Sequence, residues 1–168
     1  MKSVFYFVCA AVSLSLAFTS CDKDDNNDSG EKTVLEGKWE HSERTDYEND
    51  GYADQVESFT FSGNKFVLES TETGVNPYGE SWGYGHKLLG TFTCTESSFT
   101  IKIEKFYGFN NDDKQFDWHE YEESSVGQSY TFNYQIEKGH SLGVTAPSEF
   151  ALGGGSYLGT DQVWYTKK

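Results

Sequence analysis

Apolar and polar side chains alternate along most of the chain after about residue 33, and this period of two predicts β-strands. Six segments rich in Thr, Val, Ile and aromatic residues show it clearly, and two more show it less strongly. The clear segments are residues 58–61, 65–69, 91–95, 99–105, 130–136 and 163–166, and the weaker ones are residues 34–44 and 142–145. No segment has the apolar period of a helix. An all-β domain of about eight strands is therefore expected.

Short turn signals separate several of these strands. Gly63-Asn64 lies between two alternating segments, and Lys138-Gly139 separates another pair. Both patterns are typical of β-hairpins. Successive strands joined by hairpins form an antiparallel meander, and closing such a sheet removes its exposed edges. We therefore expect a single antiparallel up-and-down eight-stranded β-barrel.

Several short motifs resemble lipocalins. Gly37-Lys38-Trp39 is similar to the Gly-x-Trp signature at the first strand of that family. The later elements, over residues 34–168, resemble the small lipocalin-like domains of bacterial lipoproteins. They are Phe59-x-Phe61, Gly90-Thr91-Phe92, Tyr130-Thr131-Phe132 and Trp164-Tyr165-Thr166-Lys167. The resemblance implies that Trp39 plugs the closed end of the barrel under a basic side chain, for which Lys167 is available; the alternative is an ordinary core aromatic.

The N-terminus has the pattern of a secretory signal peptide. Residues 4–18 are almost wholly apolar and follow Lys2. A helix crossing the roughly 30 Å core of a bilayer needs about 20 apolar residues, so this run is too short to span. The segment Phe18-Thr19-Ser20-Cys21 resembles the lipobox of bacterial lipoproteins, in which the cysteine becomes the lipidated N-terminus. The alternative is ordinary cleavage, but the bulky Phe18 does not suit an Ala-x-Ala-like site.

These resemblances imply three parts of the chain and a location. Residues 1–20 would be the signal peptide, residues 21–33 the lipidated Cys21 with an acidic flexible tether, and residues 34–168 the barrel. Residues 22–25 are similar to the acidic export signal of lipoproteins displayed on the surface of some Gram-negative gut bacteria. We therefore expect an outer-membrane lipoprotein anchored at the cell surface. A plain tether, with the protein on the periplasmic face, is the alternative.

The charge balance excludes one class of partner. The 168 residues include 27 Asp and Glu against 13 Lys and Arg, giving a formal net charge of −14. A surface of this sign repels phosphate backbones, so no nucleic-acid partner is expected. The membrane contact is expected through the lipid anchor alone.

Two motifs suggest chemistry and fail on their context. Gly139-His140-Ser141-Leu142-Gly143 matches the Gly-x-Ser-x-Gly elbow of hydrolases, but that elbow needs a following helix and a later histidine. No helix is predicted after Gly143, and no histidine follows His140 in the sequence. The four histidines lack zinc-ligand spacing, so no metal site or cofactor is expected.

A calcium loop at residues 46–57 is left open. Asp46, Glu48, Asp50, Asp54 and Glu57 come close to the spacing of the twelve-residue calcium loop, with Gly51 at its turn position. An acidic connection between the first two strands is the competing interpretation. The acidic connection is favoured, because the flanking segments are predicted strands and because Glu48 stands where the calcium loop has Asp or Asn.

The strongest candidate site is a set of aromatic residues in predicted loops. Tyr78, Trp82 and Tyr84 alternate with glycines in a loop expected over residues 75–90, and Trp118 lies in a second loop over residues 107–126. Large rings on polar loops mark interaction sites. The up-and-down order places these loops at one end of the barrel, opposite Trp39.

Two functions follow from this arrangement. The first is non-enzymatic binding of a small apolar or glycan-like ligand at the open end, by stacking on Tyr78, Trp82, Tyr84 and Trp118. The alternative is a filled barrel that contacts another outer-membrane or surface protein. An eight-stranded barrel can be filled by side chains or hold one small ligand, so the fold does not decide between them.

Overall fold

The computed structural model describes residues 33–47, 51–109, 117–152 and 156–168. The predicted signal peptide, Cys21 and the acidic tether up to residue 32 lie outside these ranges. Within the described ranges, no helix has the length and apolar character that a membrane span requires.

The described residues form nine strands, all paired antiparallel. The strands are β1 (Gly37–Asp46), β2 (Tyr52–Ser62), β3 (Lys65–Val75), β4 (Ser81–Cys94), β5 (Ser98–Phe109), β6 (His119–Tyr121), β7 (Ser129–Glu137), β8 (Ser141–Thr145) and β9 (Val163–Lys167). Each pairs with its neighbour along the chain, except that the short β6 is added beside β5, which pairs onward with β7. Pairing of β1 with β9 closes a ring of eight strands, which confirms the predicted up-and-down barrel.

The strands are longer than the sequence pattern indicated, and one predicted loop is wrong. β3 and β4 pair continuously from Lys65 opposite Thr91 to Val75 opposite Ser81, so most of residues 75–90 is strand. Glycine is depleted in strands, so glycines that alternate with aromatic residues favour a loop when the sequence is considered alone. Here Gly74 and Gly85 lie under neighbouring rings, where a Cβ atom would collide with Trp82 and with Phe109.

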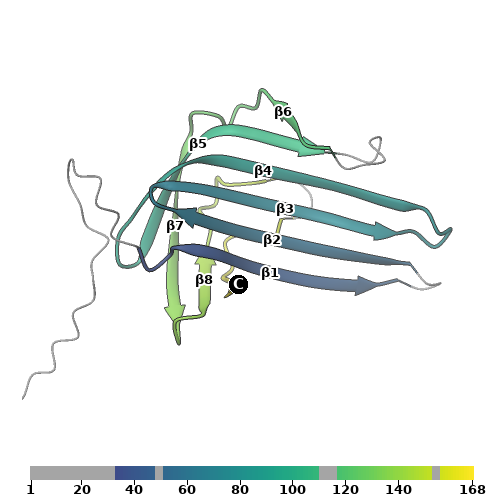
Figure 1. The fold of residues 1–168 in the computed structure, drawn as a ribbon, viewed down its shortest axis with the longest axis horizontal. Coiled ribbons are helices and arrows are strands. Elements are labelled where there is room, and N and C mark those ends of the chain that lie inside the picture. Colours follow the sequence, from purple (N-terminus) through teal and green to yellow (C-terminus); the bar gives the residue numbers. More distant parts are fainter. Residues whose placement is uncertain (1–32, 48–50, 110–116, 153–155) are drawn as a thin grey trace, which may run out of the picture.

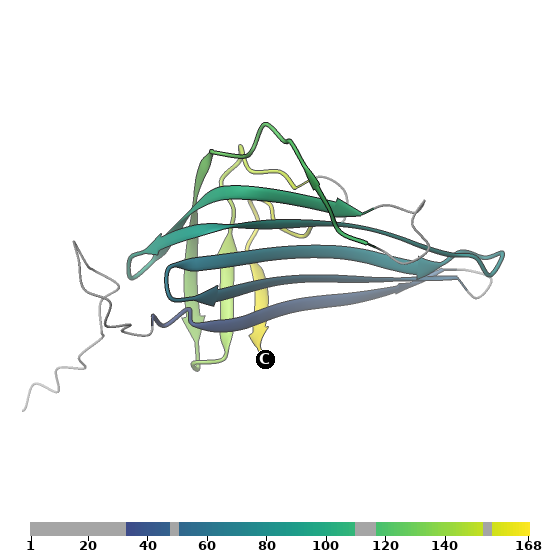
Figure 2. The same cartoon turned by 45° about the horizontal axis from the view of Figure 1, so that its top comes forward.

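The pairings that complete the barrel cover only part of the length of the long strands β1 to β5. β1 pairs with β9 at Trp39 and Glu40 alone, and β7 pairs with β5 over Ser98 to Lys102. Beyond these pairings the long strands continue past the steeply crossing β7 and β8 (Figure 1). Figure 2 shows the same overhang after rotation. We call this overhang the projecting sheet; it comprises residues 41–46, 52–57, 70–75, 81–87 and 106–109.

Aromatic side chains fill the closed part of the barrel. The Phe59 ring lies 5.6 Å from Phe61, 5.6 Å from Phe99 and 5.4 Å from Tyr165, between ring centroids. All four side chains are buried. This end of the barrel is therefore a packed core.

Trp39 sits where the lipocalin resemblance implied. Its side chain is 0% exposed, and its Nε1 donates a hydrogen bond to the Leu35 carbonyl at 2.7 Å. The Lys167 ammonium lies 4.9 Å from the centre of the Trp39 ring, from the paired position on β9. The basic side chain of the last strand thus covers the tryptophan.

The segment between β8 and β9 completes the core. Phe150 is buried, with its ring 5.0 Å from Tyr130 and 4.9 Å from Phe132. Leu152 and Leu158 are buried in the same cluster. Ser156 and Tyr157, just before Leu158, contact the base of the projecting sheet through Glu57 and His41.

Candidate functional site

The inner face of the projecting sheet carries ordered rows of side chains. Alternation along β4 puts residues 82, 84 and 86 on the same face as the core residues Leu88 and Phe92. The strand registers align the inward residues of β1 to β4 in three rows. From the core outwards the rows are His41, Glu57, Ser70, His86; then Glu43, Gln55, Glu72, Tyr84; then Thr45, Ala53, Gly74, Trp82.

Trp82 and Tyr84 form a flat aromatic surface on this inner face. Their ring centroids are 6.0 Å apart, and the planes differ by 25°. The indole leans over Gly74, where a Cβ atom would lie 2.9 Å from a Trp82 ring carbon and 2.1 Å from the Tyr52 carbonyl oxygen. Both rings remain partly exposed. Unlike the rings of the closed barrel, they are available for stacking.

Glu72 lies beside this aromatic surface. The Tyr84 hydroxyl donates a hydrogen bond to Glu72 Oε2 from the neighbouring strand. Burial, followed by the hydrogen bond and charge of Glu72, raises the pKa of Tyr84 to about 12. Tyr84 therefore stays a neutral donor and fixes the carboxylate.

A buried carboxyl group closes the base of the inner face. Glu57 is 0% exposed and accepts hydrogen bonds from Ser156 Oγ at 2.6 Å and from the Tyr165 hydroxyl. Burial raises the pKa of Glu57, and these two donors act in the opposite direction. The group joins β2, β9 and the segment between β8 and β9.

Tyr157 covers one side of the rows. Its ring meets His41 edge-on with 4.4 Å between centroids, while His41 Nδ1 donates to the Trp164 carbonyl at 2.8 Å. Burial, then the charge of Glu43 and a hydrogen bond with its carboxylate, and then the charges of Glu57 and Glu72, raise the pKa of Tyr157 to about 12. The side chain is thus held among three acidic residues.

His86 occupies the opposite side, on β4. Its ring is 5.5 Å from that of Phe106, and burial lowers its pKa, so the neutral ring is favoured. Within the described part of the chain, the buried His86 Nδ1 atom has no partner at hydrogen-bond geometry.

The predicted site residues are not all together. Trp82 and Tyr84 share the inner face, but Trp118 lies on the outer face, with the Lys87 ammonium 4.0 Å from its ring and the Phe109 ring 4.7 Å away. Tyr78 is at the tip of the β3–β4 hairpin and 89% exposed. Proximity in predicted loops did not reveal which face of the strand each ring would occupy.

Sequence reasoning missed Glu72 and Tyr157, and it considered Glu57 only as a possible calcium ligand. Glu72 and Glu57 belong to alternating strand segments, so period-two counting from Phe59 and Phe66 could have assigned their faces. Tyr157 lies in an irregular segment, where no periodic signal exists. It reaches the inner face only through the fold.

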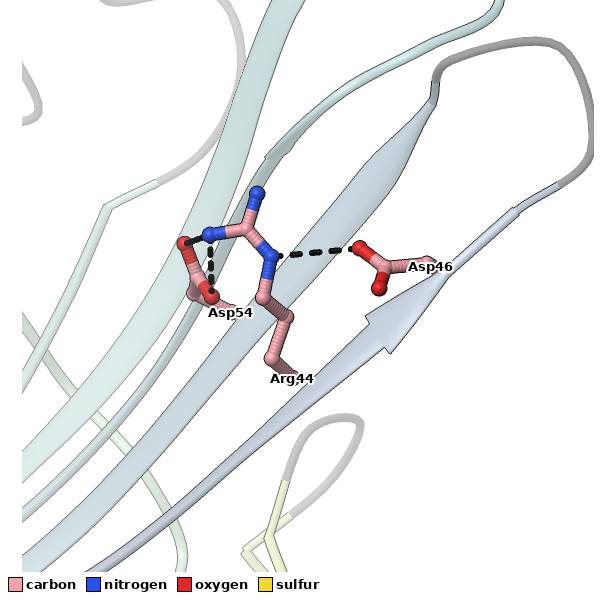
Figure 3. A network of polar contacts seen from close by, with 3 residues as sticks. All are labelled: Arg44, Asp46 and Asp54. Carbon is pink, nitrogen blue, oxygen red and sulfur yellow. Dashed lines mark hydrogen bonds and ion pairs between the residues drawn. The ribbon is translucent and has the colours of Figure 1, made fainter.

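The residues of the possible calcium loop are divided between the two faces of β2. Asp54 faces outwards, where Arg44 Nη1 lies 3.4 Å from its Oδ1 and Arg44 Nε lies 3.2 Å from Asp46 Oδ1 (Figure 3). Glu57 faces inwards and is buried. Residues 48–50 lie outside the described ranges, and no metal-holding group of three His, Cys, Asp or Glu residues occurs within those ranges.

The Gly-x-Ser-x-Gly motif lies in a hairpin. Lys138 and Gly139 have φ values of 53° and 73° in the turn between β7 and β8. Ser141 then begins β8, so a strand follows the serine where a hydrolase elbow has a helix. The motif reflects turn chemistry.

The eight-stranded antiparallel barrel, with Trp39 under Lys167, is consistent with a lipocalin-like architecture. No protein-family model matches the chain, and no curated protein matches it in sequence. The architecture is thus established by the strand pairing itself.

Proposed function

We propose that the protein is a non-enzymatic binding protein that holds a small molecule against the inner face of the projecting sheet. The main support is the pair of partly exposed, nearly parallel rings of Trp82 and Tyr84 on that face. A flat ligand group gains contact area by stacking on such rings. The surrounding polar side chains supply the hydrogen bonds that orient it.

The packing of the closed barrel supports this position for the ligand. Phe59, Phe99 and Phe132 are fully buried and belong to one hydrophobic core cluster. A ligand there would have to displace ring contacts between 5.0 and 6.1 Å. The projecting sheet offers side chains that the protein itself leaves partly exposed.

The proposal includes an anchor but no catalytic step. Lipidated Cys21 would hold the domain at the outer membrane, facing the cell surface. The open end of the barrel could then meet ligands outside the cell.

The test is native mass spectrometry of the full-length protein, purified gently from its host without added ligand. We expect a discrete excess mass that is lost in Trp82→Ala. Trp118→Ala is the matched control, because this ring packs on the outer face, and it should retain the mass. A bare wild-type mass, or equal loss in both variants, would contradict the proposal.

Contact with another surface protein is the second candidate. Tyr78 is 89% exposed at the β3–β4 hairpin tip, and Tyr47 at the end of β1 is 45% exposed. Exposed tyrosines are favoured at protein interfaces. Crosslinking on intact cells would support this candidate if a discrete heteromeric species formed and was lost in Tyr78→Ser; recovery of monomer alone would count against it.

A further inference from the structure

We propose that the ligand of the inner face is an organic cation, an amine or guanidinium group carried on a flat or apolar body. This inference rests on the proposed function, because it requires a ligand on that face. It adds the charge and chemical class that the site selects.

Charges are sorted between the two faces of the projecting sheet and the barrel. Alternation places every Lys and Arg of strands β1 to β5 outwards within the described residues. Their acidic partners lie outwards too, as in Lys87–Glu69 at 3.1 Å and Lys65–Glu104 at 3.3 Å. The inward positions carry Glu43, Glu57 and Glu72 instead. The inner face of β1 to β5 is therefore negative, with histidine as its only basic residue type among the described positions of these five strands.

Two of these acids are placed for a ligand. Glu43 and Glu72 belong to one row, separated by Gln55 on the strand between them. Two strand spacings put their backbones about 10 Å apart, so both carboxyl groups border the same part of the inner face. The Tyr84 hydrogen bond uses Glu72 Oε2, and a carboxylate can accept through both oxygens.

Aromatic faces beside these acids favour the same class of ligand. Trp82 and Tyr84 follow one another on the inner face, and Tyr157 lies close enough to Glu43 and Glu72 for their charges to act on it. The negative face of an aromatic ring attracts a cation, most strongly for Trp. A cation held between the rings and the carboxylates is attracted both by the ring faces and by the negative charges.

A buried ring nitrogen on this face is free to take a donor ligand. A neutral His86 ring with its proton on Nε2 presents Nδ1 as an acceptor that no described residue uses. An ammonium or guanidinium group carries only N–H donors. An anionic ligand would instead face the Glu43 and Glu72 carboxyl groups, and a glycan would bind without a charge preference.

The test measures binding of three probes that share a phenylethyl body. Phenethylamine is the cation, 2-phenylethanol the neutral analogue and 3-phenylpropanoate the anion. Calorimetry on the full-length protein in mild detergent at low salt should show phenethylamine binding at least about tenfold more tightly than 2-phenylethanol, as carboxylate and cation–π contacts together predict. 3-Phenylpropanoate should bind most weakly. Equal affinity for amine and alcohol would overturn the inference.

Matched variants separate this inference from the proposed function. Glu72→Gln should weaken phenethylamine binding about fivefold and leave 2-phenylethanol binding unchanged. Glu69→Gln, on the outer face of the same strand, should change neither. Trp82→Ala should weaken both probes. If 2-phenylethanol binds through Trp82 and the amine shows no advantage, only the charge inference fails; if no probe binds, both proposals fail.

Discussion

Glu57 shows how one buried residue can connect several elements. Its carboxyl group accepts from Ser156 and Tyr165, so β2, β9 and the segment after β8 meet at one side chain. Burying a carboxylate is costly unless donors surround it. Burial raises the pKa of Glu57 and the hydrogen bonds lower it, with burial the larger effect, so the contribution of this group to stability depends on pH.

We expect Glu57 to stabilise the fold more at low pH. Burial raises its folded-state pKa above the ordinary value of 4.5, so the folded state binds the proton more tightly than the unfolded state. This contribution is fully present below pH 4.5 and is lost as pH rises through the folded-state pKa. Glu57→Gln cannot titrate. Thermal melts should therefore show the stability of wild type relative to Glu57→Gln falling from pH 4.5 to neutral pH; a constant difference would contradict the assignment.

Gly90 permits a close backbone approach at the bulge between β4 and β5. The register shifts between Leu89 and Gly90, and a Cβ atom on Gly90 would lie 1.9 Å from the Lys102 carbonyl oxygen. Because this neighbour is backbone, it cannot rotate away. Gly90→Ala should lower the free energy of unfolding by about 1–3 kcal/mol in urea titrations. Gly159→Ala is the control, since no atom lies within 4 Å of its Cβ position, and a similar loss there would refute the argument.

At the scale of elements, alternation determines which side chains the core receives. β9 illustrates this with two neighbouring aromatic residues on opposite faces. Tyr165 is 1% exposed and packs on Phe59, whereas Trp164 is 37% exposed.

Truncating these two residues should have very different effects. Tyr165→Ala removes a buried ring and should cost about 3–5 kcal/mol of unfolding free energy. Trp164→Ala removes a larger side chain from the outer face and should cost less than about 1 kcal/mol. Chemical denaturation of both variants is the measurement. Comparable losses would mean that the face assignment of β9 is wrong.

Strand length was the least predictable property of the elements. The sequence pattern indicated the existence of β4 but began it near Thr91, whereas it begins at Ser81. Glycine lowers intrinsic strand preference, yet pairing with β3 and the space that Gly74 and Gly85 leave for neighbouring rings outweigh it. Tertiary contacts thus extended the strand.

The whole molecule combines a filled barrel with a sheet that continues beyond it. The filled part explains stability, because its aromatic residues are buried from solvent. The projecting sheet presents side chains that the core does not need. In place of a choice between a hollow and a filled barrel, the described residues form a part filled by side chains and a sheet that projects beyond it.

The location of the molecule is tested through its predicted anchor. Cys21→Ser should move the protein from the membrane fraction to the soluble fraction, because acyl chains on this cysteine supply the stable membrane attachment. Fractionation of host cells with immunoblotting measures this. Cys9→Ser is the control, as Cys9 lies in the predicted signal peptide. Unchanged membrane association of Cys21→Ser would rule out lipidation as the anchor.

The sequence by itself determined the all-β class, the hairpins at Gly63 and Gly139, and Trp39 as a core residue under Lys167. These properties depend on local alternation, turn chemistry and short motifs, which are written along the chain. Only the tertiary structure decided that Trp118 lies apart from Trp82, and that Glu43, Glu72 and Tyr157 come together. Those relations depend on register between strands and on where a non-periodic segment packs, and both arise from contacts between residues distant in sequence.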